Sequence, residues 1–537
     1  MPLTTHPVLP RTAAFTSRVP GRRRTAVLAG VALIATGLVP LTAAGSAEAG
    51  PADARAASTA TTAAAKRSTG DVMANLFEWN WPSVAKECTS VLGPAGYAGV
   101  QVSPPQDSLK RTKLGDGSDT VLHPWWEVYQ PVGYELTSRM GSEAEFKAMV
   151  KACRGAGVKV YVDAVINHMT GQGNTSYGGR SYEHFSYPGL YSAADFHQNG
   201  PDCTSAGGGI EDFNNLIQVR NCELVGLSDL KTGNAAVQAK LAGYLNKLIG
   251  YGVSGFRVDA AKHLGQPDLA AIAARLNRTV DGTRPYLALE VFGGGPGILS
   301  PFAFTSVGSV LGLDADIQLK NAFKSYPANA TGSLATLKVF GAGSGLPAGD
   351  KALTFVQNHD TERNGDALNY KDGAGNILAH QFLLAYGYGT PQVYSGFAWA
   401  TRDDSPPSDA NGLITDTDCA ADTWVCVDRD PAVLAMVGWH NTVAGAPVAN
   451  WWDDGQNLIA FSRGNRGWVA LNNDPVAHTR SFGTGLAKGT YCNLIQGGSS
   501  GGSCSGSTVE VDGDGRASVT VPTQGSVAID VTSRVRS

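Results

Sequence analysis

The stretch Gly255-Phe256-Arg257-Val258-Asp259-Ala260-Ala261-Lys262-His263 decides the fold, because charged side chains follow directly on an apolar run. Residues 255–258 have strand character. Arg257 and Asp259 are two residues apart, so both side chains point to the same face of that strand. The carboxyl ends of parallel strands share one face of an α/β barrel, where functional residues collect. The stretch therefore predicts a barrel strand that ends at a functional site.

Similar apolar runs recur on both sides of this stretch. They cover residues 72–77, 99–102, 158–166, 286–291, 352–356 and 390–394. Residues 143–154 and 235–249 have apolar side chains at spacings of three and four, which is typical of amphipathic helices. With residues 313–319 as an eighth strand, the alternation predicts an α/β fold, a (β/α)8 TIM barrel. A doubly wound open sheet is the alternative.

Residues 1–49 have the pattern of a secretory signal peptide. A cationic stretch, 18–24, precedes an apolar run, 26–41, and the small-residue sequence Ala47-Glu48-Ala49. The alternative, a membrane anchor, needs about 20 apolar residues, and this run is shorter. We therefore expect a secreted, extracellular protein that leaves the membrane once the signal is cleaved. The arginine pair leaves Sec and twin-arginine export both open.

Changes in composition divide the rest of the chain. Residues 50–69, rich in Ala, Ser and Thr, are expected to be a propeptide or linker. The barrel is assigned to 70–167 and 230–443. Residues 168–229 are too many for a structureless loop and predict a small domain inserted after the third strand. Short alternating segments between Gly and Asn turns predict a C-terminal antiparallel β-sandwich domain over 444–537.

Composition and charge limit the class of partner. The chain is 43% hydrophobic and 16% charged, as in folded globular proteins, and its net charge is -4. Without a basic field to hold a polyanion, no nucleic-acid partner is expected; we expect a monomer. The even number of cysteines, 8, favours disulfides in an oxidising compartment. Local spacing suggests Cys419 with Cys426 and Cys492 with Cys504, while the other pairings stay open.

Polar clusters follow the predicted strands. They are Asp163 with Asn167 and His168, then Arg257 with Asp259, Lys262 and His263, then Glu290, and then Asn358 with His359 and Asp360. Cleavage of a glycosidic bond with retention needs a carboxylate nucleophile and a carboxylic acid about 5–5.5 Å apart. Burial after an apolar run should raise the pKa of Glu290, and the Arg257 cation should keep Asp259 ionised. Each residue alone could be a structural ion pair, but the clusters together predict an active site.

Four of these segments resemble, in order, the signature regions of the α-amylase family, glycoside hydrolase family 13. They are 163–168 (DAVINH), 255–263 (GFRVDAAKH), 288–291 (ALEV) and 355–360 (FVQNHD). The likeness continues through 101–105 (QVSPP), 124–131 (PWWEVYQP), 218–222 (QVRNC) and 450–453 (NWWD). It thus covers most of residues 70–537 and is strongest to animal-type and secreted actinobacterial α-amylases.

The resemblance implies an enzyme that hydrolyses internal α-1,4-glucosidic bonds of starch, glycogen and maltooligosaccharides by a retaining double displacement. Asp259 would be the nucleophile, Glu290 the general acid/base, and Asp360 the carboxylate that stabilises the transition state. Substrate contacts are implied for Trp125, Trp126, Tyr129, Gln130, His168, Arg257, Lys262, His263 and His359. An α-glucan transglycosylase on the same scaffold, or a carbohydrate-binding protein without catalysis, is the alternative.

The resemblance also implies bound ions and two further disulfides. A structural Ca²⁺ would be held by Asn167, Asp229 and the backbone carbonyls of Arg220 and His263, although Asn167 and Asp229 could instead cap loops. The implied disulfides are Cys88 with Cys153 and Cys203 with Cys222. Animal-type members bind chloride with two arginines and an asparagine. Arg257 and Asn358 match two of these, but Gln392 stands in place of the second arginine, so we predict chloride-independent activity.

Overall fold

The computed structural model describes residues 70–115, 119–293, 295–324, 332–500 and 503–535. The predicted signal peptide, 1–49, and the predicted propeptide or linker, 50–69, lie outside the described residues.

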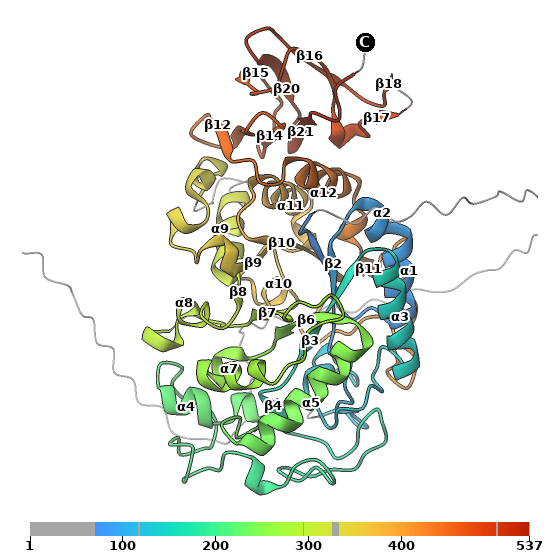
Figure 1. The fold of residues 1–537 in the computed structure, drawn as a ribbon, viewed down its shortest axis with the longest axis vertical. Helices are drawn as coiled ribbons and strands as arrows, with labels where there is room; N and C mark the ends of the chain where they lie inside the picture. Colours follow the sequence, from blue (N-terminus) through green and yellow to red (C-terminus); the bar gives the residue numbers. More distant parts are fainter. Residues whose placement is uncertain (1–69, 116–118, 294, 325–331, 501–502, 536–537) are drawn as a thin grey trace, which may run out of the picture.

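Eight parallel strands form a closed barrel in the middle of the molecule (Figure 1). In order around the barrel they are β1 (Met73–Leu76), β2 (Gly99–Val102), β3 (Lys159–Ala164), β6 (Val253–Val258), β7 (Tyr286–Leu289), β8 (Ser309–Leu311), β9 (Ala352–Phe355) and β10 (Thr390–Phe397). Because β10 also pairs with β1, the sheet has no open edge there. The predicted TIM barrel is confirmed, and the open-sheet alternative is wrong.

One predicted strand is wrong. Residues 313–319 belong to a helix, α9 (Leu313–Phe323), and the barrel strand is the shorter β8 just before it. Apolar and polar residues alternate strictly from Leu313 to Leu319, which imitates a strand. In the helix, Ile317 is 37% exposed and Asp316 is buried, the reverse of what the alternation predicted.

Helices surround the barrel. The longer ones are α1 (Trp81–Glu87), α3 (Glu143–Gly155), α5 (Ala235–Tyr251), α7 (Gln266–Ala274), α9, α11 (Ala374–Tyr386) and α12 (Pro431–Val443). Shorter turns are α2 (Gly93–Ala95), α6 (Ala261–Leu264), α8 (Pro301–Phe304) and α10 (Thr361–Asn364). The two helices predicted from their periodicity, 143–154 and 235–249, correspond to α3 and α5.

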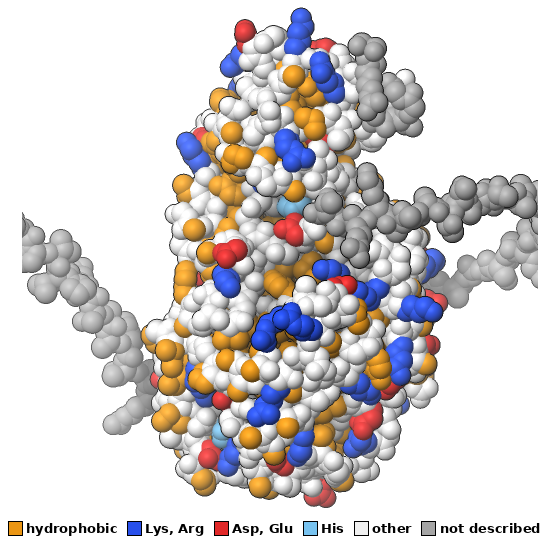
Figure 2. All heavy atoms as spheres, viewed as in Figure 1, with side chains coloured by type: hydrophobic (Ala, Val, Ile, Leu, Met, Phe, Trp, Pro, Cys, Tyr) orange, Lys and Arg blue, Asp and Glu red, His pale blue; other side chains and the backbone are white. Residues whose placement is uncertain are grey.

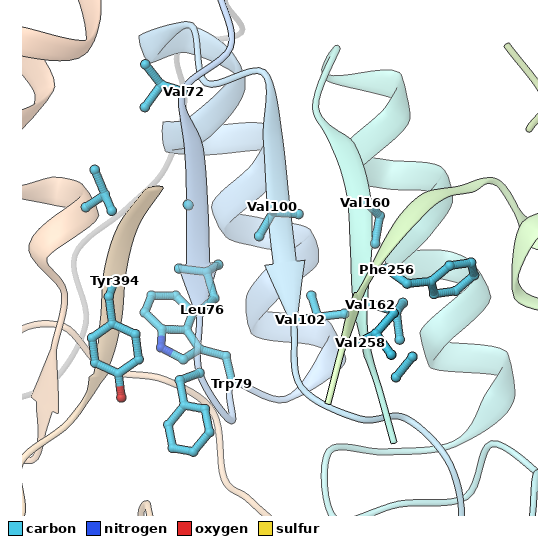
Figure 3. Close-up of a cluster of buried hydrophobic side chains, with 14 of the residues drawn as sticks. Val72, Leu76, Trp79, Val100, Val102, Val160, Val162, Phe256, Val258 and Tyr394 are labelled. Atoms are coloured by element: carbon cyan, nitrogen blue, oxygen red, sulfur yellow. The ribbon is translucent and has the colours of Figure 1, made fainter. Parts of the chain in front are cut away.

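Alternate strand residues face the helices and the barrel interior. Side chains such as Val100, Val162, Phe256 and Val258 are buried in the core that surrounds the barrel (Figure 3). A separate cluster fills the barrel itself: Met73, Ala288, Leu311, Leu313, Leu353 and Phe355. The intervening positions near the carboxyl ends of the strands are polar. This alternation places Arg257 and Asp259 on the inside of β6.

The chain between β3 and β6 leaves the barrel and returns. The part of it that precedes α5 starts and ends in a short antiparallel pair, β4 (His168–Met169) with β5 (Ser228–Asp229). Between them lie loops and the helix α4 (Leu216–Asn221), joined by the disulfide Cys203–Cys222. Figure 1 shows this inserted segment at the opposite end of the barrel from the C-terminal strands.

The C-terminal strands form antiparallel sheets, and the main sheet packs against the helices of the barrel. This main sheet contains β12 (Val448–Asp453), β13 (Leu458–Arg463), β14 (Gly467–Asn472) and β21 (Gly525–Asp530). Smaller pairs are β15 (His478–Gly483) with β20 (Arg516–Val521), β16 (Gly489–Cys492) with β19 (Thr508–Val511), and β17 (Ser499–Ser500) with β18 (Ser503–Cys504). Another short strand, β11 (Trp424–Val425), pairs with β10.

Both faces of the main C-terminal sheet are buried. Leu458, Ala460 and Trp468 pack toward the smaller strand pairs. Ile459 and Phe461, the alternate residues, belong to the same core as α11 and α12. The predicted C-terminal β-domain is confirmed, and it shares a continuous apolar core with the barrel.

Covalent links tie several elements together. The disulfides are Cys88–Cys153, Cys203–Cys222, Cys419–Cys426 and Cys492–Cys504, the four pairs expected from spacing and resemblance. On the face viewed in Figure 2, basic and acidic side chains are interspersed. None of the helices in the described ranges combines the length and apolar character that crossing a bilayer requires.

Candidate active site

Arg257 joins three carboxylates at the carboxyl ends of β3, β6 and β7. Its Nη1 donates to Asp163 Oδ1 at 2.8 Å and to Asp259 Oδ1 at 2.6 Å, and its Nη2 donates to Glu290 Oε1 at 2.7 Å. Val258 pairs with Leu289, so Asp259 and Glu290 follow matched positions of neighbouring strands. The barrel thus brings together the residues predicted as nucleophile and acid.

The electrostatics of this cluster differ in part from the prediction. Burial raises the pKa of Glu290 to about 7, as expected for a carboxyl group in a dry site. Burial also raises the pKa of Asp259 to about 7, because desolvation outweighs the Arg257 cation. The expectation that Arg257 simply keeps Asp259 ionised is therefore wrong: the cation binds both carboxylates. Two neighbouring carboxyl groups held by one cation titrate as a pair, and neither titrates independently of the other.

Asp360 lies beside this pair at the start of α10. Its side chain is 31% exposed, compared with 12% for Asp259 and 11% for Glu290, so it is the carboxylate most open to solvent. Its Oδ2 lies 3.2 Å from His359 Nε2. Burial lowers the pKa of His359 to about 3, so the ring is neutral and its Nε2–H can donate to Asp360. The backbone N–H of Asp360 donates to Asn358 Oδ1 at 2.9 Å.

Three of the predicted aromatic contacts lie on one 3-10 turn, residues Trp125–Tyr129. Trp125 Nε1 donates to the Arg402 carbonyl at 2.9 Å, and Trp126 Nε1 donates to Asp403 Oδ1 at 3.2 Å. Tyr129 donates its hydroxyl to Asp163 Oδ2 at 2.8 Å. These hydrogen bonds fix the ring planes. Trp125 and Tyr129 are buried, whereas Trp126 keeps part of its ring exposed.

The remaining predicted contacts lie around the same end of the barrel. His168 Nε2 donates to the Tyr129 carbonyl at 3.1 Å, and burial lowers its pKa to about 4. Gln130 Oε1 accepts a hydrogen bond from Thr170 at 2.7 Å. Lys262 Nζ donates to the Phe292 carbonyl at 3.2 Å. These bonds place each of the three side chains at the carboxyl side of the barrel.

The residues predicted to hold calcium lie between the barrel and the inserted segment. Asn167 Nδ2 donates to Asp229 Oδ1 at 3.1 Å, and both residues are buried. His263 Nδ1 donates to the Val219 carbonyl at 2.7 Å, which joins α6 to α4 next to Arg220. Arg220 stands in the last turn of α4, where helix carbonyls lack a partner within the helix. One carboxylate, one amide oxygen and two carbonyls are donors that suit a hard cation such as Ca²⁺.

The predicted chloride position contains no second arginine. Gln392 lies inside the barrel on β10, and its Nε2 donates to Gln101 Oε1 at 3.0 Å. Arg257 is engaged by three carboxylates, and the Asn358 amide oxygen accepts two backbone N–H groups at the start of α10. Neither Gln392 nor Asn358 has a charge with which to attract an anion.

Sequence reasoning missed several residues at this site. Asp163 was noted only as part of a polar cluster, yet it receives hydrogen bonds from both Arg257 and Tyr129. Phe77 stacks on His359 with ring centroids 4.6 Å apart, and Arg363 lies among aromatic rings close behind it. An aromatic residue at the end of the first strand was the available signal for Phe77. Nothing in its spacing indicated a histidine partner.

Comparisons with known proteins agree with this architecture. The family model "Alpha amylase, catalytic domain" matches residues 129–285, and "Alpha amylase, C-terminal all-beta domain" matches residues 449–532. An α-amylase of Thermomonospora curvata is 43% identical over 95% of this chain and 79% of its own length. An α-amylase of Tribolium castaneum is 39% identical over 86% of this chain and 94% of its own.

Solved structures give the same result. The crystal structure of α-amylase I from Eisenia fetida has a TM-score of 0.81 and 37% identity, and the match covers 86% of this chain and 97% of that one. A mutant of the same enzyme in complex with maltohexaose matches with a TM-score of 0.80 and 38% identity over the same shares.

The closed barrel and the buried carboxylates at its carboxyl end define a (β/α)8-barrel glycoside hydrolase. With relatives about 40% identical over most of its length, the chain belongs to the α-amylase family.

Proposed function

We propose that this enzyme hydrolyses internal α-1,4-glucosidic bonds of starch, glycogen and maltooligosaccharides with retention of the anomeric configuration. One observation carries the proposal: Asp259 and Glu290, buried at the ends of adjacent strands, are held by the two Nη atoms of a single guanidinium. Retaining glycosidases need a carboxylate and a carboxylic acid as close neighbours, and a shared cation keeps two such groups together. The substrate class comes from the family.

In the first step, Glu290 donates its proton to the glycosidic oxygen while an Asp259 carboxylate oxygen attacks the anomeric carbon. The bond between that carbon and the glycosidic oxygen breaks, and the leaving chain departs as an alcohol. Asp259 is left as a glycosyl ester and Glu290 as a carboxylate. Asp360 faces the positive charge that develops on the sugar. Because this attraction is stronger in the transition state than in the bound substrate, it lowers the barrier.

In the second step, Glu290 accepts a proton from water as the water oxygen attacks the anomeric carbon. The ester bond to Asp259 breaks, the sugar leaves with its original α configuration, and both carboxyl groups return to their starting states. His168, neutral by burial, donates its N–H to the Tyr129 carbonyl, and its unpaired Nδ1 can accept a hydrogen bond from a sugar hydroxyl. His359, also neutral by burial, contacts the sugar beside Asp360, toward which its Nε2 points. In this proposal Trp126 and Trp125 provide a stacking surface for glucosyl rings, and Gln130, Lys262 and His263 contact the bound glucan.

The test is a reducing-sugar assay on soluble starch that compares the wild type with Asp259→Asn. We expect activity in the wild type and a loss of at least about 10³-fold in the variant, because the nucleophile is gone. Asp350→Asn, at an exposed position on a distant turn, is the matched control and should retain full activity. NMR of the first products should show the α-anomer; a β-anomer would rule out the double displacement.

The family also implies a structural calcium ion, and the donors described above fit it. The ion would be held by Asn167, Asp229 and the carbonyls of Arg220 and His263, where it would fasten the inserted segment to the barrel. We expect EGTA to lower the Tm of the wild type by several degrees, and Ca²⁺ to restore it. Asp229→Asn should abolish this response, whereas Asp212→Asn, exposed in the same segment, should keep it.

Chloride-independent activity remains our proposal, because a neutral glutamine stands where animal-type members have a cation. Dialysis into chloride-free buffer should leave kcat within twofold of its value in chloride. The proposal is overturned if removing chloride lowers the rate several-fold and adding it back restores the rate.

Compartment and processing are also proposals. Secretion is supported by the four disulfides, since such bonds persist in oxidising compartments. The monomeric state, the signal peptide at 1–49 and the propeptide or linker at 50–69 are proposed from the sequence alone. N-terminal sequencing of enzyme from the culture medium should give a start between Gly50 and Gly70. Size-exclusion chromatography with light scattering should give the mass of one chain.

A further inference from the structure

The imidazole ring of His359 is clamped between two aromatic rings. On one side lies Phe77, with centroids 4.6 Å apart and planes 8° apart; on the other lies Tyr129, at 5.0 Å and 20°. Trp125 meets the edge of the imidazole at 5.3 Å and 68°. Stacked and edge-on contacts of this kind fix a ring plane. His359 therefore has no freedom to tilt while Phe77 and Tyr129 remain in place.

The clamp continues outward from Phe77. The Phe397 ring lies nearly parallel to it, with centroids 5.9 Å apart and planes 18° apart. The Arg363 guanidinium lies 4.5 Å from the Phe397 centroid and donates to Glu362 Oε1 at 3.1 Å. Because Arg363 and Glu362 are only 1% and 3% exposed, this ion pair is a fixed support.

The members of the clamp come from separate parts of the chain. Phe77 follows β1, Tyr129 ends the 3-10 turn, and Phe397 ends β10. Their side chains converge on the residue that precedes Asp360. Tyr129 is further held by its hydrogen bond to Asp163, which is itself bound to Arg257. The orientation of His359 is thus set by tertiary packing around it, in addition to its contact with Asp360.

We propose that Phe77 is a positioning residue for catalysis: it acts through His359, whose ring it holds in the plane that directs Nε2 toward Asp360 and the sugar. This proposal rests on the proposed function. Phe77 itself is 1% exposed, so it packs behind His359 and takes no part in substrate contact. Loss of its ring frees the imidazole to tilt, and small displacements of a transition-state contact lower the rate more than they weaken substrate binding.

The test is a double-mutant cycle between Phe77→Leu and His359→Ala on a maltooligosaccharide of defined length. We expect Phe77→Leu to lower kcat about tenfold with KM within twofold of wild type. In the His359→Ala background the same change should cost less than about twofold, because the residue through which it acts is gone. Phe77→Tyr keeps the ring and should retain most of the kcat.

A buried phenylalanine away from the site provides the control. Phe146 is 0% exposed and packs edge-on against Trp81 on the outside of the barrel. Phe146→Leu should lower the Tm, as Phe77→Leu does, but leave kcat and KM of the folded enzyme unchanged. A fall in kcat in both variants means that general loosening explains the effect, and this result overturns the proposal.

Independent losses in the cycle also overturn it: if the two changes multiply, Phe77 does not act through His359. If Phe77→Leu yields no folded protein, Phe397→Leu takes its place. It removes the next ring outward and should lower kcat about threefold, again without further effect in the His359→Ala background. An inactive wild type, or full activity in Asp259→Asn, would count against the proposed function. If Asp259→Asn is inactive but Phe77→Leu and His359→Ala lower kcat independently, only the role of Phe77 is overturned.

Discussion

Two buried ionisable residues at the carboxyl ends of barrel strands differ in their hydrogen bonding. Arg257 donates hydrogen bonds to three carboxylates. Glu78 is 0% exposed, has a left-handed backbone with φ of 55°, and its carboxylate oxygens have no hydrogen-bond partner among the described residues. Burial raises the pKa of Glu78 to about 8, although Arg139 and Arg363 lower it in part. At neutral pH Glu78 is therefore a neutral acid.

The raised pKa makes stability depend on pH. In the unfolded chain Glu78 titrates near 4.5, so its contribution to stability is complete below that pH and is lost as pH rises toward about 8. The slope is at most about 1.4 kcal/mol per pH unit. We expect Glu78→Gln to lose less unfolding free energy than the wild type between pH 5.5 and about 8. Denaturant unfolding measures this, with exposed Glu183→Gln as control; parallel curves for wild type and Glu78→Gln would contradict it.

Without the family resemblance, the candidate site could be predicted from the sequence where residues directly follow a strand. Asp259 and Glu290 directly follow β6 and β7, so the barrel topology was enough to bring them together. Asp360 lies five residues beyond the end of β9, at the start of α10, and its role was implied by the family resemblance. The contact between Phe77 and His359 joins residues almost three hundred positions apart and depends on side-chain packing. The binding of Glu290 by Arg257 also depends on where a long side chain turns, which no spacing specifies.

At the scale of elements, Gly255 sets the approach of β6 to β7. A Cβ added there would lie 2.3 Å from the Tyr286 carbonyl oxygen and 2.8 Å from its backbone nitrogen. Backbone atoms cannot yield as a flexible side chain does. Since Asp259 ends β6 and Glu290 ends β7, any separation of these strands separates the two carboxylates.

Gly255→Ala should therefore reduce both stability and rate. We expect a loss of about 1–3 kcal/mol in unfolding free energy, as for overpacked cores, and a fall in kcat of at least tenfold. Gly243→Ala is the control: it lies exposed in α5 with nothing within 4 Å of an added Cβ, and should stabilise the helix by about 0.5–1 kcal/mol. Thermal unfolding and starch assays measure both; an active, unperturbed Gly255→Ala would show that the strands adapt.

The mistaken eighth strand shows the limit of periodicity for short elements. β8 is only 3 residues long, too short for an alternation to be recognised, and the helix after it imitates one. Tertiary contacts determine which segment is the strand, since β8 pairs with β7 on one side and with β9 on the other. The longer strands and helices, with several repeats of their period, were predicted with nearly the right ends.

At the scale of the whole molecule, the C-terminal sheet is part of the core of the enzyme. Trp439 Nε1 of α12 donates to the Ile529 carbonyl at 3.0 Å, and Arg463 Nη1 donates to the Ala385 carbonyl at 2.8 Å. Ile459, Phe461 and their neighbours bury the same interface from the side of the sheet.

We therefore expect the barrel to be poorly soluble when the C-terminal strands are removed. A chain that ends at Val443 would expose the apolar outer faces of α11 and α12, and we expect it to aggregate or to lose most activity. Expression of residues 70–443 beside residues 70–535, followed by starch assays on the soluble fractions, measures this. A soluble, fully active 70–443 would show that the interface contributes little.

The burial of both faces of the main C-terminal sheet also limits where two enzymes of this family can be joined in a chimera. In the outer layer, the pairs β15 with β20 and β16 with β19 bury their apolar side chains in a core shared with the main C-terminal sheet. The inner face of the main sheet packs against α11 and α12; for example, the Phe461 ring contacts the rings of Phe382 and Tyr386 on α11. A chimera between two such enzymes should thus tolerate a crossover that moves α11, α12 and the C-terminal strands together, and fail when the crossover falls in the loop between α12 and β12. The unit that two such enzymes can exchange is therefore the C-terminal strands together with α11 and α12.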